Sequence, residues 1–485
     1  MPTSSLPRTS PETQGLSSAA VHAFLDVIDA RADLELHSLM ILRHGNVLAE
    51  GWWHPYGRDQ LHLLYSLSKS FTSTAAGMAE AEGLLSLDDR VVDVFPEHAN
   101  VVADERIREL TLRQCVRMAT GHREDPLERA FQASPDDLVR GFLGVGLDED
   151  QGSIFCYNNL ATFVVGAAVQ KAAGETLVNF LTPRLFRPLG IDRVYWQTDT
   201  QGRNLGFSGL HLTTESIARF GQLILQGGRW NDQQLLDPDW LALATSKQTD
   251  NSLREGGPDW QQGYGYQFWL SRHGFRGDGA FGQFCVVLPE QDALLITTSA
   301  TNDLQAVLDA AWDHLLPGFA EAPLPADETT AAALTERLEQ LSLPPVGTAE
   351  WTGQSTPEPA EALQVIKIEP AGDQQFMITT QRDQPPAASP RITAGTTLLP
   401  LTFRCGVGQW SSDVIEIDGA ELPYAGSAAG SADGVLDAEI SFLQVPHRLR
   451  VHRDADGTVE LGWYTTPLGR PFPELLATWP VDLSH

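Results

Sequence analysis

The stretch YSLSKSF, residues 65–71, places a lysine three positions after a serine at the predicted start of a helix. Residues three apart lie on the same helix face, so Lys69 is directed toward the hydroxyl of Ser66. A serine in the first turn also lies near the positive end of the helix dipole, where developing negative charge is favoured. Burial can lower the pKa of a lysine, and a neutral amine can accept the serine proton. The pair therefore has the chemistry of an activated nucleophile.

The same residues also have a purely structural interpretation. Ser66 can cap the helix and Lys69 can extend its ammonium group to solvent. Basic charge in this chain is carried mainly by arginine, and the four lysines lie at positions 69, 171, 247 and 367. A Ser-x-x-Lys match is short, so its significance depends on other motifs.

Two further motifs follow in the chain. Tyr157-Asn158-Asn159 leads into a helix of small residues predicted over 158–175, and a glycine-rich turn from Gly277 to Gly282 leads into an apolar strand. Taken alone, the first motif fits core packing with a helix cap, and the second fits a β-turn or bulge. Their significance lies in the order of all three motifs.

The ordered set resembles the serine β-lactamase and penicillin-binding-protein superfamily. The tyrosine in the second motif makes it most similar to the class C-like branch, which includes esterases, D-aminopeptidases and 6-aminohexanoate-dimer hydrolases. The resemblance covers about residues 10–315. It extends to the stretches HSLMILRHGNVLAEGWW, LTLRQCVRMATGH, SGLHLTTESIARFGQLILQGGRW and YGYQFW.

The resemblance implies a role for each motif residue. Ser66 would be the acylated nucleophile and Lys69 its immediate partner. Tyr157 would be the general base, held as a phenolate or near it by Lys69, and would return the proton to the leaving group. Asn159 would bind the substrate amide or orient Lys69. The backbone N–H groups of Ser66 and Ala280 would form the oxyanion hole.

The third motif departs from the pattern of the superfamily. Its relatives carry a lysine or histidine where this chain has Gly277, followed here by Asp278 and Gly279. Arg276 or His273 is the candidate substitute for the missing cation. The carboxylate of Asp278 is expected to repel anionic substrates, so weak turnover of β-lactams is predicted, and a lysine at position 277 is expected to increase it.

The expected fold is α+β, with a β-lactamase/penicillin-binding-protein-like antiparallel sheet flanked by helices and a helical subdomain. The 38–53 hairpin and strands within 263–300 would form the sheet. Helices are predicted over 12–31, 67–82, 212–228 and 303–315. The hydrolase domain would span 1–320 and retain the complete catalytic set. A Pro-rich linker (321–350) with a helix at 329–341 would precede a small all-β sandwich or barrel (351–485), with a hairpin turn at Asp456-Gly457.

Composition limits the choice of partners. The formal net charge of −30 argues against nucleic acid and against an anionic membrane surface. No stretch approaches the roughly 20 apolar residues that span a bilayer, and the first 15 residues have no apolar leader, so a cytoplasmic location is expected. Scattered cysteines, with no paired spacing, indicate a reducing compartment and no structural zinc. They lie at positions 115, 156, 285 and 405.

The sequence therefore predicts a serine hydrolase that cleaves an ester or amide of a small acid, without metal or cofactor. A β-lactamase or D-amino-acid peptidase is the alternative enzyme. An inactive binding or sensor protein on the same fold is the alternative of another class. The oligomeric state is left open.

Overall fold

The structure is a computed structural model that describes residues 5–102, 104–351, 357–361, 363–372, 374–382, 400–469 and 472–483. Two segments of the expected β-domain, 352–356 and 383–399, lie outside the described residues. Residues 1–4 also lie outside the described residues, and they belong to the first 15 residues, in which no apolar leader was expected.

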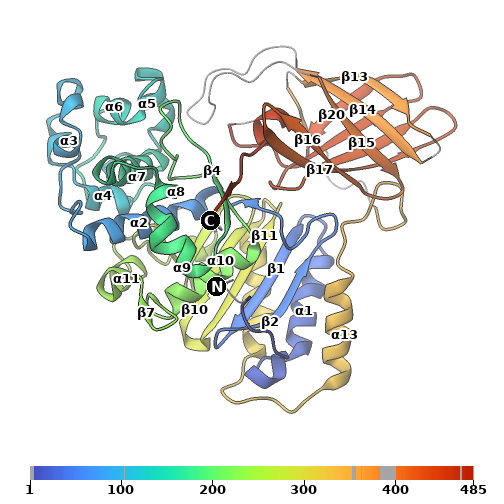
Figure 1. Cartoon of the computed structure of the whole chain (residues 1–485), viewed down its shortest axis with the longest axis horizontal. Helices are drawn as coiled ribbons and strands as arrows, with labels where there is room; N and C mark the ends of the chain where they lie inside the picture. Colours follow the sequence, from blue (N-terminus) through green and yellow to red (C-terminus); the bar gives the residue numbers. More distant parts are fainter. Residues whose placement is uncertain are drawn as a thin grey trace.

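A six-stranded antiparallel sheet lies at the centre of the N-terminal part, with the strand order β2-β1-β11-β10-β9-β8 (Figure 1). The expected 38–53 hairpin forms β1 and β2, and the strand expected over 263–270 shortens to β8. The strand bounds are Leu36–Arg43 (β1), Asn46–Trp52 (β2), Trp269–Leu270 (β8), Phe275–Gly279 (β9), Gln283–Leu288 (β10) and Ala293–Ser299 (β11).

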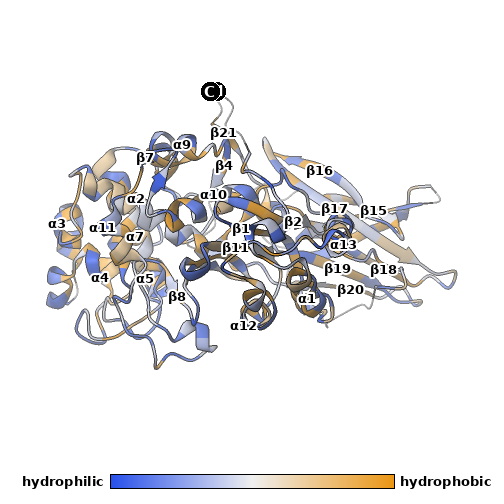
Figure 2. Cartoon of the chain, turned by 90° about the horizontal axis from the view of Figure 1, so that it is seen from below, coloured by the Kyte–Doolittle hydropathy of each residue, from blue (hydrophilic) through white to orange (hydrophobic). Residues whose placement is uncertain are grey.

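Both faces of this sheet are covered, which explains its unbroken apolar strands. Every residue of β1 is buried. Met40 and Leu42 pack into a core shared with helix α10 (Thr214–Leu225). Leu39 and Ile41 point to the opposite face and pack with helices α1 (Ser18–Asp29) and α12 (Leu304–Ala310). Figure 2 shows the sheet between these helices.

Helices α1, α12 and α13 cover one face of the sheet and α10 the other. Their bounds are Ser18–Asp29 (α1), Leu304–Ala310 (α12), Glu328–Glu339 (α13) and Thr214–Leu225 (α10). The helix predicted from residue 12 begins at Ser18, because residues 11–14 form a separate 3₁₀ turn that Gly15 closes with a positive φ of 72°. Helix α13, which lies in the expected linker, packs against α1 and β2.

A helical subdomain lies beside the sheet, with α2 and α7 packed together at its centre (Figure 1). Its helices are Ser68–Ala81 (α2), Val91–Val94 (α3), Leu112–Val116 (α4), Leu127–Ala133 (α5), Leu138–Gly144 (α6), Asn159–Ala173 (α7), Leu177–Leu181 (α8), Arg187–Leu189 (α9) and Pro238–Ala244 (α11). Short strands border it: His62–Leu63 (β3), Arg193–Trp196 (β4), Leu210–Leu212 (β5), Arg229–Trp230 (β6) and Gln233–Gln234 (β7). Helix α7 is buried on nearly all sides, as its uniformly small and apolar sequence predicts.

In its described residues, the C-terminal part is an all-β domain built on one nine-stranded sheet. Strand β13 contacts β20, so the sheet curls back on itself. Gly457, in the predicted hairpin turn between β19 and β20, has a φ of 90°. The bounds are Glu358–Pro359 (β12), Leu363–Pro370 (β13), Gln375–Arg382 (β14), Leu401–Val407 (β15), Ser411–Ile417 (β16), Ala420–Gly430 (β17), Leu436–Phe442 (β18), Arg448–Arg453 (β19) and Val459–Trp463 (β20).

The β-domain is joined to the N-terminal part by more than the chain connection. A final strand, β21 (Val481–Asp482), returns to pair with β4 of the N-terminal part. Leu63, Tyr65 and Phe281 of the N-terminal part belong to the hydrophobic core of the β-domain. Two of these residues adjoin the motifs predicted to form the active site.

Candidate active site

Ser66 lies in a 3₁₀ turn, η2 (Tyr65–Leu67), directly before helix α2. The turn is fixed on both sides, because the Leu64 N–H donates to the Leu210 carbonyl (2.8 Å) and the Ser70 hydroxyl donates to the Gln267 carbonyl (2.9 Å). The first turns of α2 are buried, yet Ser66 itself is partly exposed. The sequence therefore presents one accessible hydroxyl at the edge of a rigid, buried helix.

Lys69 is 1% exposed, and its ammonium nitrogen lies among three oxygen atoms. Nζ is 2.9 Å from Ser66 Oγ, 2.7 Å from Asn159 Oδ1 and 2.9 Å from the Phe207 carbonyl oxygen. The predicted proximity of Ser66 and Lys69 is thus present, and the Asn159 side chain binds Lys69. A carbonyl and an amide oxygen accept hydrogen bonds only, so two N–H bonds of Lys69 are directed away from the serine.

Asp125 determines the orientation of Asn159. The Asn159 side-chain NH₂ donates to Asp125 Oδ2 at 2.7 Å, and a carboxylate can only accept, so the amide oxygen faces Lys69. Asn158, the residue before it, caps helix α7 by accepting from the Ala161 N–H at 2.9 Å. The start of helix α7 thereby holds Asn159 beside Lys69.

Tyr157 forms one wall of the site. Its ring stacks on Trp269 at a centroid distance of 5.2 Å, and Lys69 Nζ lies 4.8 Å from its centroid. Its packed surroundings raise the pKa of the Tyr157 phenol well above its ordinary value, and the Asp278 carboxylate raises it further, while a hydrogen bond with Ser66 acts in the opposite direction. These surroundings favour a neutral phenol, whereas the resemblance implied a phenolate or a group close to one.

The glycines of the third motif allow strand β9 to lie directly against the nucleophile turn. A Cβ atom on Gly279 would come within 2.1 Å of the Leu64 carbonyl oxygen, and one on Gly277 within 2.3 Å of Leu67 Cδ1 and 2.8 Å of Ser70 Oγ. A lysine at position 277, which was expected to help bind β-lactams, would have to displace the ends of the Leu67 and Ser70 side chains, so this expectation stays a prediction with a steric cost against it.

The candidate substitutes for the missing cation are engaged elsewhere. Arg276 is fully buried and binds Asp278, with Nε 3.0 Å from Asp278 Oδ2. This ion pair compensates the charge of Asp278, so the expected repulsion of anionic substrates is weakened. His273 packs against Trp312. Another cation, partly exposed Arg254, lies over Trp269 at 5.1 Å.

The segments that carry the expected oxyanion donors have unusual backbones. Tyr65, before Ser66, has a φ of 46°, and Phe281, after Ala280, has a φ of 64°. A bulky residue in this left-handed region costs about 1–3 kcal/mol, and the surrounding structure must supply that energy. Gln283 Nε2 donates to the Ala280 carbonyl at 3.1 Å, which fixes the second segment. Both Ser66 and Ala280 are partly exposed, as donors to a substrate must be.

Three contributors to the site are absent from the sequence prediction. Asp125 lies in an acidic stretch that reads as surface, and the Phe207 carbonyl is a backbone group that no side-chain pattern marks. Trp269 stands in the YGYQFW stretch, which supported the resemblance but carried no assigned role. The signal for Asp125 is only its position between the first two motifs.

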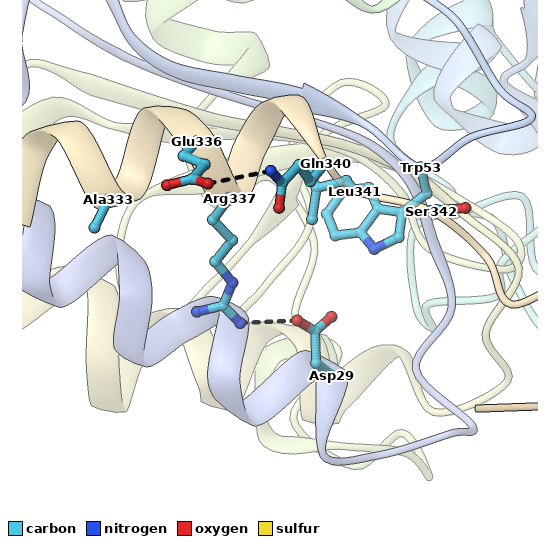
Figure 3. Close-up of a pocket in the computed structure, with 8 residues that line it drawn as sticks. All are labelled: Asp29, Trp53, Ala333, Glu336, Arg337, Gln340, Leu341 and Ser342. Atoms are coloured by element: carbon cyan, nitrogen blue, oxygen red, sulfur yellow. Dashed lines mark hydrogen bonds and ion pairs between the residues drawn. The ribbon is translucent and has the colours of Figure 1, made fainter. Parts of the chain in front are cut away.

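A cavity of about 420 Å³ lies elsewhere, between α1 and α13 (Figure 3). Arg337 is paired with Asp29 there at 2.8 Å, and none of the residues around Ser66 lines the cavity. Within the described residues, no group of three or more His, Cys, Asp or Glu side chains could hold a metal ion, and no helix has the length and apolarity to cross a bilayer.

Comparisons with known proteins show the family of the N-terminal part. The Beta-lactamase family model matches residues 26–317, more than half of the chain. The chain is 25% identical to a 6-aminohexanoate-dimer hydrolase of Paenarthrobacter ureafaciens over 291 residues, which are 55% of this chain and 73% of that protein. It is 29% identical to a lovastatin esterase of Penicillium rubens over 166 residues, 30% of this chain and 41% of that one.

Solved structures show the same fold for the N-terminal part. A Bacillus anthracis protein designated a 6-aminohexanoate-dimer hydrolase superposes with a TM-score of 0.53 at 20% identity, covering 66% of this chain and 90% of that one. EstCE1, a hydrolase with promiscuous acyltransferase activity, gives a TM-score of 0.51 at 18% identity, covering 61% and 98%. The α+β fold predicted from the sequence is confirmed, and the chain belongs to the beta-lactamase family.

Proposed function

We propose that this protein is a serine hydrolase that cleaves an ester or amide of a small acid through an acyl-enzyme on Ser66. The observation that carries the proposal is the position of Lys69 Nζ, 2.9 Å from Ser66 Oγ in a buried site. Relatives named as an amide-dimer hydrolase and an esterase support the substrate class.

In the proposed first step, Lys69 takes the proton of Ser66. As a neutral amine, Lys69 donates its two N–H bonds to Asn159 Oδ1 and to the Phe207 carbonyl, which leaves its lone pair for the Ser66 hydroxyl. The Ser66 oxygen then bonds to the substrate carbonyl carbon, and the N–H groups of Ser66 and Ala280 stabilise the oxyanion.

The neutral Tyr157 donates its proton to the leaving group as the bond to the acyl carbon breaks. Lys69, now an ammonium, returns a proton to Tyr157. Water attacks the acyl-enzyme along the reverse route and releases the acid. Because its pKa is raised, Tyr157 is protonated before the reaction and can donate its proton, whereas a phenolate base would have to be ionised already.

The test is a substrate panel with p-nitrophenyl acetate, an amide dimer and nitrocefin. Ser66→Ala should fold normally and lose turnover by on the order of 10³-fold or more, because the catalytic groups act as a unit. The neutral ester or amide should be cleaved faster than anionic nitrocefin, because the third motif offers no free cation. Wild-type rates in Ser66→Ala would overturn the proposal, and labelling of Ser66 by a fluorophosphonate distinguishes an enzyme from an inactive binding protein.

A further inference from the structure

The residue before Ser66 is anchored in the C-terminal β-domain. The Tyr65 hydroxyl lies 2.6 Å from Nε2 of His447, a residue 382 positions later in the chain. His447 Nδ1 lies 2.8 Å from the Thr465 carbonyl oxygen, which can only accept, so Nδ1 carries the hydrogen. Nε2 is then the acceptor, and Tyr65 donates to it. Burial lowers the pKa of His447 to about 3, which keeps this neutral tautomer across the ordinary pH range.

The same histidine contacts the second oxyanion segment. The ring of Phe281 meets the ring of His447 at 5.3 Å and that of Tyr65 at 5.4 Å, both in edge-to-face geometry. Ala280 packs against the core of the β-domain. The rings of Tyr65, Phe281 and His447, which come from two domains, thus pack against one another. Tyr65 and Phe281 are the neighbours in sequence of Ser66 and Ala280, the expected oxyanion donors.

The backbone at these two positions needs such an anchor. Tyr65 and Phe281 both have positive φ, a conformation that bulky side chains rarely adopt unless their surroundings impose it. Relaxation of φ at Tyr65 would rotate the peptide that carries the Ser66 N–H. The matched family region ends at residue 317, so the anchor comes from a part of the chain outside it.

We propose that His447 is a positioning residue for catalysis: through Tyr65 and Phe281 it holds the N–H groups of Ser66 and Ala280 toward the substrate oxyanion. The β-domain is then required for the geometry of the active site. This inference rests on the proposed hydrolase function. It makes the oxyanion geometry, and not substrate binding, dependent on the second domain.

The experiment compares Tyr65→Phe, His447→Ala and His447→Gln with wild type on p-nitrophenyl acetate. Tyr65→Phe keeps the ring and removes the hydroxyl, which binds His447 at 2.6 Å and also accepts from the Leu468 N–H at 3.4 Å. We expect kcat to fall roughly 10-fold or more in Tyr65→Phe and further in His447→Ala, with KM little changed, because one oxyanion donor is worth about 10²–10³ in kcat. His447→Gln, whose amide oxygen can accept from Tyr65, should recover part of the loss.

Affinity for phenylboronic acid provides a second readout. Its tetrahedral adduct on Ser66 places an oxygen in the oxyanion position, so its affinity should fall in parallel with kcat. His452→Ala is the control, because His452 lies on β19, the strand that directly follows His447, and binds Asp437 at 2.8 Å, away from the turn. It should retain wild-type kcat.

The inference is overturned if Tyr65→Phe and His447→Ala keep kcat and boronate affinity within twofold of wild type. It is also overturned if their losses equal that of His452→Ala, which would indicate a general effect on stability. Ser66→Ala separates the two claims. If that variant remains active, the proposed function fails, whereas a dead Ser66→Ala beside an unaffected Tyr65→Phe removes only the role of His447.

Discussion

At the scale of single residues, the site depends on one amide whose two ends have different partners. Asn159 accepts from Lys69 and donates to Asp125, so the carboxylate of Asp125 indirectly aims the lysine at Ser66. The pair Ser66 and Lys69 was predictable because i and i+3 meet on any helix. Asp125 was not, since it precedes helix α5 by two residues and meets Asn159, 34 positions later, only through the tertiary fold.

Asp125→Asn should lower kcat by about tenfold. The amide at position 125 can present either end to Asn159, so the Asn159 oxygen is no longer held toward Lys69. A lost hydrogen bond to a charged group is worth about 1.5–3 kcal/mol, and turnover of p-nitrophenyl acetate measures it. Glu124→Gln is the control, because it removes an exposed neighbouring charge. Equal rates in both variants would exclude the positioning role of Asp125.

Tyr157→Phe tests whether the Tyr157 phenol donates a proton to the leaving group or acts as a phenolate base. We expect kcat to fall at least about 100-fold, the usual effect of a lost general acid. Because the pKa of Tyr157 is raised, its proton is present throughout pH 5–9. Ionisation of this phenol therefore cannot cause the rise of kcat/KM with pH, and the ascending limb of that pH profile should stay in place in the variant. A limb that disappears in Tyr157→Phe would indicate a phenolate base.

The control for this variant is Tyr266→Phe. The Tyr266 hydroxyl accepts from Arg113 at 3.0 Å and has no proposed part in the reaction. Its pH profile and kcat should match those of wild type.

At the scale of elements, the approach of strand β9 to η2 and α2 sets the shape of the site. Glycine at positions 277 and 279 was visible in the sequence, and a turn or bulge was the ordinary interpretation. Only the structure shows that these positions face the Leu64 carbonyl and the Leu67 side chain. A sequence reports which residue is small but not which neighbour requires it to be small.

Gly277→Ala should destabilise the protein by about 1–3 kcal/mol and reduce turnover, because the added methyl overpacks against Leu67 and Ser70. Urea unfolding and p-nitrophenyl acetate hydrolysis measure the two effects. Gly57→Ala is the control, since the nearest atom to its Cβ would be 4.0 Å away. If the two variants behave alike, the close approach of β9 does not shape the site.

The elements with strong periodicity were predicted well, and those set by tertiary contacts were not. The hairpin at 38–53 and helix α10 carry alternating or amphipathic patterns that local reasoning detects. The strand expected before Trp269 fails to extend, because Gln267 has a φ of 65° and donates to the Val116 carbonyl at 2.6 Å, while Tyr264 packs against Tyr157. The Pro-rich composition of 321–350 indicated a linker, yet α13 packs on α1 and β2.

At the scale of the whole molecule, the two parts share a charged contact as well as a core. Glu35 in the N-terminal part lies 2.6 Å from Arg448 of the β-domain, and both side chains are mostly buried. Burial alone would raise the pKa of Glu35, but the Arg448 charge and a hydrogen bond from His37 outweigh it, so the pKa is lowered. The pair therefore adds stability above the ordinary pKa of a glutamate and loses it as pH falls through the lowered value.

Arg448→Met should cost about 3–5 kcal/mol of unfolding free energy at pH 7, because it leaves Glu35 and Glu439 buried without their shared arginine. Burial then raises the pKa of Glu35, so the difference from wild type should shrink toward pH 4 as Glu35 becomes protonated. Urea unfolding at both pH values measures this. Arg450→Met, which breaks a pair with Asp437 inside the β-domain, should cost about 1 kcal/mol or less. A pH-independent difference would contradict the account.

The central claim is the acyl-enzyme on Ser66, and mass spectrometry of acid-quenched protein tests it most directly. After mixing with p-nitrophenyl acetate, wild-type protein should carry one acetyl group, and peptide mapping should place it on Ser66. Ser66→Ala should carry none. Turnover that continues without an adduct on Ser66, or an adduct that persists in Ser66→Ala, would contradict the account.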